Sequence, residues 1–137
     1  MIIKMRTIFQ LTIFFLLFSP KVFSQTILNT VAPIDIAPVA SGAEGFYEGS
    51  VQYTTGLSFN LKADCATSCS GMVIVQASND KVTYEDIPQV TQVFTGASTN
   101  FLFNIFNIRF LYFRIVIRNT GGETITPVGT FSVKTQI

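Results

Sequence analysis

From Ser50 onward, apolar and polar residues alternate along much of the chain. Leu57, Phe59 and Leu61 are separated by polar residues, which places the three apolar side chains on one face of a strand. The segment 72–78, MVIVQAS, is more continuously apolar, as expected for a central strand that is covered on both faces. Further strands are predicted at 89–95, 100–106, 111–119 and 129–135.

Turn-forming residues separate these segments at 78–80, 96–98 and 119–122. Cys65 and Cys69 lie between the first two strands, and the loop that carries them is expected to join those strands. Short strands at this spacing, with no helical stripe after the N-terminal region, predict an all-β fold. The expected architecture is a single antiparallel β-sandwich or jelly roll.

The N-terminus has the pattern of a cleavable secretory signal peptide. Two basic residues precede an apolar run at 8–18, and Pro20 follows it. That run is shorter than the about 20 residues that span a bilayer. We expect a signal peptide over 1–24, cleaved between Ser24 and Gln25, with an uncleaved anchor as the alternative. The exported protein would then be extracellular, at the cell surface or periplasmic, and would meet a membrane only during export.

Residues 25–49 are rich in small residues and include Pro33 and Pro38. Proline removes a backbone donor and restricts such a segment to a sheet edge or an extended arm. Apolar residues such as Val31 would be poorly placed in water, so we predict an N-terminal arm that docks as a strand on a sheet edge. The high effective concentration of a tethered strand favours docking in cis over docking in trans. The sandwich domain is expected over 50–137.

The charge and the composition of the chain exclude several classes of function. Loss of residues 1–24 would remove three of the nine basic residues and none of the eight acidic ones, leaving six minus eight, a net charge of −2. This composition lacks the basic surface of a nucleic-acid-binding protein. The chain contains no histidine, so the usual general base and the usual catalytic triad are missing. We therefore expect neither an enzyme nor a cofactor.

Cys65 and Cys69 would enter an oxidising compartment after export, where a disulfide is the expected state. Two thiolates without any histidine are a poor set of metal ligands, so no metal site is predicted. Glu85 and Asp86 are adjacent, and in a strand they would point to opposite faces. This favours a solvated acidic turn over the convergent carboxylate pair of a glycosidase.

The segment 112–119, YFRIVIRN, contains the candidate binding residues. The period of two gives a face with Phe113, Ile115 and Ile117 and an opposite face with Tyr112, Arg114, Val116 and Arg118. Two guanidinium groups and a phenol in one row can bind planar polar ligands, including sugars and carboxylates. The alternative is that the arginines pair across strands with Glu85, Asp86 or Glu123.

Residues 71–88, GMVIVQASNDKVTYEDIP, and 109–122, RFLYFRIVIRNTGG, resemble the paired core motifs of discoidin-like, galactose-binding-type β-sandwich domains. Those domains have an apolar strand, a Ser-Asn-Asp-Gly turn, an aromatic residue and, later, a Tyr-x-Arg strand. Lys81 occupies the usual glycine position of that turn, and Tyr84 stands where tryptophan is common. The resemblance implies a β-sandwich and places Tyr84 with the candidate ligand-binding residues.

The sequence therefore favours a non-catalytic exported module for recognition at a cell surface or in the extracellular space, with a glycan or a cell-surface protein as its partner. The alternative is a structural subunit of an extracellular or envelope assembly, formed through sheet edges or the N-terminal arm. The dense apolar segment 101–111 favours self-association, because it exceeds what one face of a small sandwich requires.

Overall fold

The computed structural model describes residues 27–51 and 54–136. The predicted signal peptide and its cleavage site lie outside the described residues. The strands are β1 (Ile27–Ile34), β2 (Glu44–Ser50), β3 (Thr54–Ser78), β4 (Glu85–Asp86), β5 (Gln92–Phe106), β6 (Tyr112–Asn119) and β7 (Thr126–Gln136), and a short 3-10 helix, η1 (Pro88–Val90), precedes β5. Within these ranges no helix is long and apolar enough to cross a membrane.

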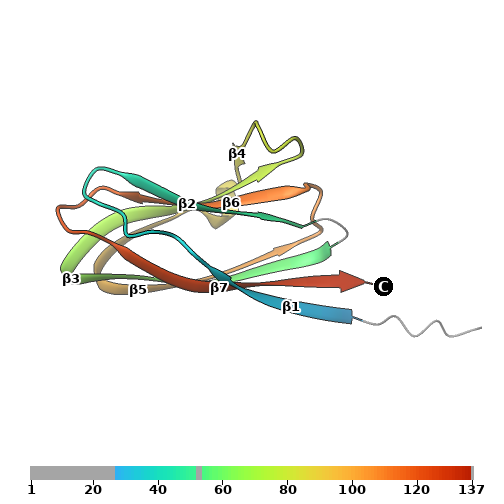
Figure 1. Ribbon diagram of the computed structural model, residues 1–137, viewed down its shortest axis with the longest axis horizontal. Coiled ribbons are helices and arrows are strands. Elements are labelled where there is room, and N and C mark those ends of the chain that lie inside the picture. The colour runs from blue at the N-terminus through green and yellow to red at the C-terminus, as the bar shows by residue number, and fades with distance from the viewer. Residues whose placement is uncertain (1–26, 52–53, 137) are drawn as a thin grey trace, which may run out of the picture.

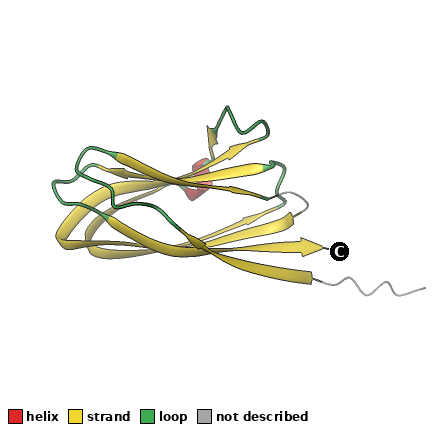
Figure 2. Ribbon diagram, viewed as in Figure 1, coloured by secondary structure: helices red, strands yellow, loops and turns green. Residues whose placement is uncertain are grey.

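The strands form two antiparallel layers, which confirms the predicted β-sandwich (Figures 1 and 2). The first half of β3 pairs with β7, which in turn pairs with β1. The second half of β3 pairs with β6, which pairs with β2. β5 pairs with β3 from Gly56 to Val73 and so contributes to both layers. Among the described strands, β4 pairs only with the end of β3.

β3 and β5 are longer than the sequence pattern predicts, because each strand passes from one layer to the other. Their pairing register shifts between Asp64 and Cys69, where the strands bend (Figure 1). Cys65 and Cys69 form the expected disulfide at this bend, with their Cα atoms 6.0 Å apart. The expectation that the disulfide loop joins two separate strands is wrong. The expected turn at 96–98 is likewise part of one strand, since a bulged strand can bend without ending.

The core lies between the two layers and consists of the inward residues of each strand. Leu57, Phe59 and Leu61 are at most 1% exposed, which confirms their predicted position on one face. Val73 and Val75 are buried in the core, and Ile74 on the opposite face is also buried, as predicted for a central strand covered on both faces. Burial of these apolar side chains provides the main driving force for folding.

The segment from 27 to 50 supplies an edge strand to each layer. β1 pairs with β7 of the same chain, which is the arrangement expected for docking in cis. Pro33 lies in β1 opposite Thr130, and an edge strand tolerates proline because one side of its backbone has no partner strand. β2 pairs with β6 and so lies directly beside the predicted binding residues.

Candidate functional site

The outer face of the layer formed by β2, β6 and the second half of β3 carries the candidate site. Phe113, Ile115 and Ile117 are at most 1% exposed and point into the core, as the alternation in β6 predicts. Arg114 and Arg118 therefore lie on the outer face of the same strand. The strand register arranges this face in three rows of neighbouring residues. The first row contains Glu48, Arg114, Gln76 and Asp86. The second contains Phe46, Val116 and Ile74, and the third contains Glu44, Arg118 and Met72.

Arg114 is held between two aromatic rings. Its guanidinium carbon lies 4.4 Å from the centre of the Phe46 ring and 3.9 Å from the centre of the Tyr84 ring. Its Nη2 donates a hydrogen bond of 2.9 Å to Oε2 of Glu48, while its buried Nε has no partner among the described residues. Cation–π contacts and the ion pair together fix the guanidinium in one orientation.

Glu48 joins Arg114 to a second cation. The Nζ of Lys81 lies 3.4 Å from Oε1 of Glu48 and 5.9 Å from the centre of the Tyr112 ring. The hydrogen bond from Arg114, with smaller contributions from Tyr84 and Lys81, lowers the pKa of Glu48 below its usual value. Burial, reinforced by the nearby Glu48 carboxylate, raises the pKa of Tyr84 to about 12. Near neutral pH, Glu48 is therefore ionised and Tyr84 is protonated.

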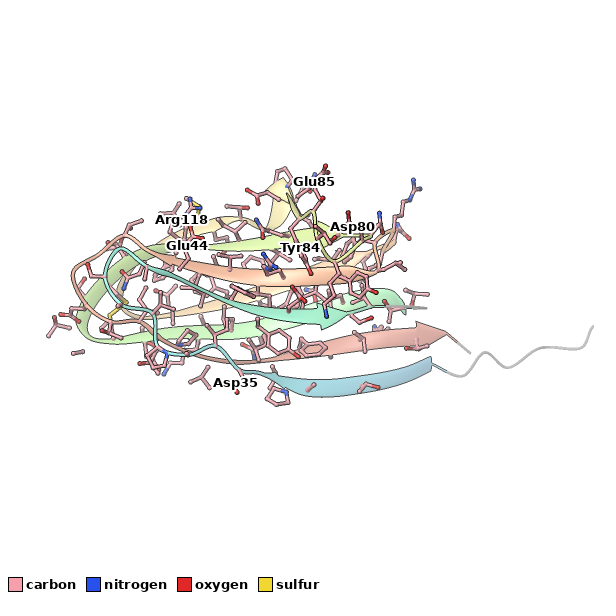
Figure 3. The ribbon with its side chains drawn as sticks, turned by 45° about the horizontal axis from the view of Figure 1, so that its top comes forward. Asp35, Glu44, Asp80, Tyr84, Glu85 and Arg118 are labelled. Carbon is pink, nitrogen blue, oxygen red and sulfur yellow. A yellow bond between two sulfur atoms is a disulfide. The ribbon has the colours of Figure 1, made fainter. Side chains whose placement is uncertain are left out.

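A second ion pair, between Arg118 and Glu44, lies at the other end of this face (Figure 3). Both arginines therefore pair with β2, and the suggested pairing with Glu85, Asp86 or Glu123 is wrong. The Asp86 carboxylate instead accepts a hydrogen bond of 2.8 Å from Nε2 of Gln76. Glu123 accepts hydrogen bonds from the backbone N–H and hydroxyl of Thr67.

A shallow hollow of about 400 Å³ opens between these side chains. It is lined by Glu44, Phe46, Ile74, Gln76, Asp86, Arg114, Val116 and Arg118. Ile74 and Val116 are buried and form its floor, whereas the Phe46 ring is 55% exposed. The hollow thus combines an apolar surface with donors and acceptors of hydrogen bonds.

The four predicted binding residues do not all reach this hollow. Arg114 and Arg118 line it, and Tyr84 stacks on Arg114 from outside the lining. Tyr112 lies in the row beyond Arg114, next to Lys81, and is not part of the lining. Sequence reasoning missed Phe46 and its two flanking glutamates. The alternation in EGFYEGS, residues 44–50, is the signal that could have placed all three on one face.

The turn that leads to Tyr84 is organised by Asp80. Its Oδ1 accepts hydrogen bonds of 2.8 Å from the backbone N–H groups of Val82 and Thr83 and one of 2.9 Å from the Ser78 hydroxyl. Lys81 has a φ of 63°, in the left-handed region that favours glycine. It occupies the glycine position of the turn in the discoidin-like resemblance. The turn places Tyr84 against Arg114.

Asp80 makes the stability of this turn dependent on pH. The backbone N–H groups of Thr83 and Val82 lower the pKa of its carboxyl to about 2 from an ordinary 3.8. The ionised form therefore stabilises the fold above about pH 4, and this contribution is lost as the pH falls toward 2. We expect Asp80→Asn to lower the melting temperature at neutral pH and to flatten its decline between pH 4 and 2. Parallel melting profiles for the two proteins would contradict this role.

A second hollow, of about 460 Å³, lies beside the same turn. Asp80, Glu85, Asp86 and Phe110 contribute to its wall. Nowhere in the part of the chain that the structure describes do three His, Cys, Asp or Glu side chains gather in an arrangement that could hold a metal ion.

No family model matches the sequence, and no curated protein matches it. Among solved structures, the SPBc2 prophage-derived protein YomS is 14% identical, with 84% of this chain and 100% of that chain covered and a TM-score of 0.50. A protein of the Bacillus endospore appendages, a family of disulfide-linked pili, is 17% identical, with coverage of 83% and 91% and a TM-score of 0.47. A CBM4 structure is 13% identical, with coverage of 86% and 81% and a TM-score of 0.43. At this identity, the likeness to YomS shows the fold alone.

Proposed function

We propose that this chain is a non-catalytic, exported β-sandwich module that binds glycan in the hollow over β2, β6 and β3, at a cell surface or in the extracellular space. The observation that carries the proposal is the exposed Phe46 ring beside the fixed guanidinium of Arg114. A pyranose ring has an apolar C–H face and a rim of hydroxyl groups. An aromatic ring packs against the apolar face, and converging polar groups bind the hydroxyls.

The charges of the hollow favour an uncharged sugar. Arg114 is paired with Glu48, and Arg118 is paired with Glu44, so each cation is matched by a carboxylate. The guanidinium groups retain N–H donors for hydroxyl oxygens, and the carboxylates can accept hydrogen bonds from hydroxyl groups. In this proposal Tyr84 and Tyr112 are positioning residues, because Tyr84 stacks on Arg114 and Tyr112 lies beneath Lys81.

Replacing Phe46 by alanine should weaken glycan binding by about 10-fold, since the loss of one stacking contact is worth about 1.4 kcal/mol. The measurement is isothermal titration calorimetry with short neutral oligosaccharides from envelope and extracellular polysaccharides. Phe106→Ala is the matched control, because Phe106 is 69% exposed but lies on the other layer. The proposal fails if the wild-type protein binds no sugar at millimolar concentration, or if both substitutions weaken binding equally.

A second candidate function is that of a structural subunit that assembles through its sheet edges. Leu102 and Phe106 on β5 are 68% and 69% exposed, and large apolar side chains along an unpaired sheet edge can bind another strand. Only some of the apolar residues in the segment 101–111 are therefore available for assembly, because Phe101 and Phe103 are buried in the core. The two functions use different layers of the sandwich and are compatible.

A further inference from the structure

The second half of β5 is a sheet edge without the usual protection against pairing, because the register shift with β3 lies before it, between Gly96 and Ser98. Among the described strands β5 pairs only with β3, so the other side of its backbone faces away from the sheet. Its fifteen residues, QVFTGASTNFLFNIF, include no charged residue and no proline. Natural edge strands usually carry charges, prolines or other features that prevent them from pairing with a strand of another molecule.

Among the described strands, the long edges formed by β1 and β2 have this protection. β1 contains Pro33, which cannot donate a hydrogen bond to a further strand. β2 carries Glu44 and Glu48, and both are held in ion pairs with β6. β5 is therefore the edge best suited to accept another strand.

The side chains on the second half of β5 have a self-complementary pattern. Leu102, Asn104 and Phe106 alternate along the strand and lie on its outer face, and the Asn104 amide oxygen accepts a hydrogen bond of 2.7 Å from the Ser58 hydroxyl on β3. Phe101 and Phe103 point the other way, into the core. Consider a second, antiparallel copy of the strand, paired so that the two Asn104 residues lie opposite each other. Leu102 of each copy would then lie opposite Phe106 of the other copy.

We propose that two copies of this chain dimerise by antiparallel pairing of their β5 strands about a twofold axis at Asn104. Each Leu102 then packs across the strands against Phe106 of the second copy, and the unpaired backbone groups of both edges form hydrogen bonds. The absence of charge on β5 removes the repulsion that two identical strands could otherwise meet.

A second copy fits this edge better than an unrelated strand does, because a twofold pairing needs only one self-complementary surface. It would join the layers that contain β1, β7, β3 and β5 into one continuous sheet. The glycan hollow lies on the other layer and stays open in both copies, so the dimer would present two binding sites. The inference deepens the second candidate function and does not depend on glycan binding.

The test is sedimentation velocity over a range of concentrations, on the chain expressed from its full sequence. We expect wild-type protein to have twice the monomer mass, and the double variant Leu102→Lys/Phe106→Lys to raise the dimer dissociation constant at least about 100-fold. Val31→Lys is the matched control and should remain dimeric, because Val31 is 66% exposed on the edge strand β1 of the same layer. Circular dichroism melts of both variants establish that they are folded.

Disulfide trapping provides a second measurement that does not depend on the lysine variants. In Asn104→Cys the two introduced thiols lie opposite each other at the twofold axis, so mild oxidation should link the copies covalently. Thr130→Cys, exposed on β7 of the same layer, should remain unlinked. A monomeric wild-type protein overturns the inference. A wild-type dimer whose Asn104→Cys variant cannot be linked also overturns it. An oligomer that persists in the double variant overturns it as well, and in that case the second candidate function would require assembly through another edge.

Discussion

Replacing Phe113 by alanine is expected to lower the free energy of unfolding by about 3–5 kcal/mol, a large part of the total stability of a small domain. The Phe113 side chain is fully buried, with 0% exposure. Its ring centre lies 5.2 Å from that of Phe59, 5.3 Å from that of Phe131 and 6.1 Å from that of Tyr47. Because these rings come from four strands in both layers, an alanine would leave a cavity that the layers cannot readily close.

The measurement is urea denaturation followed by far-ultraviolet circular dichroism, since the chain has no tryptophan. Phe46→Ala is the matched control. The Phe46 ring is 55% exposed and packs against the Arg114 guanidinium, so its loss should cost no more than about 1 kcal/mol. Equal losses for the two variants would show that Phe113 does not hold the layers together. The control also establishes whether the glycan-binding variant is folded.

Replacing Asn119 by alanine is expected to cost about 3 kcal/mol, although this residue lies at the end of β6 and looks like an ordinary turn residue in the sequence. Its side chain is 1% exposed. The amide nitrogen donates hydrogen bonds of 2.9 Å to the Val39 carbonyl and 2.6 Å to the Glu123 carbonyl. The amide oxygen accepts one of 3.0 Å from the backbone N–H of Gly121. Alanine would leave all three backbone groups without these partners.

Urea denaturation of Asn119→Ala tests this expectation directly, with Asn100→Ala as the control. Asn100 is exposed on β5, so its replacement should change the free energy of unfolding by less than about 0.5 kcal/mol. A loss below about 1 kcal/mol for Asn119→Ala would mean that water or a rearranged loop replaces the amide. In that case the link between the segment before β2 and the loop after β6 would be unimportant for stability.

The candidate site shows why only part of it could be predicted from the sequence. The alternation within β6 placed Arg114 and Arg118 on an outer face, because neighbouring side chains of any strand point to opposite sides. It could not identify their partners, since Glu48 and Glu44 come from a strand about 70 residues earlier, with separations of 66 and 74 residues. Phe46 lies on that same earlier strand, so its contact with Arg114, and with it the hollow, could not be predicted from the sequence.

The sequence by itself determined the all-β class, the inward and outward faces of the strands and the Cys65–Cys69 disulfide, because these depend on residues close together in the chain. Only the tertiary structure decided that β3 and β5 each run through both layers, because a bend at a bulge has the same glycine and small-residue pattern as a turn. Tertiary structure likewise decided the role of Asn119, whose amide reaches the Val39 carbonyl 80 residues away. Such contacts depend on which strands become neighbours, and that is determined by the packing of the whole core.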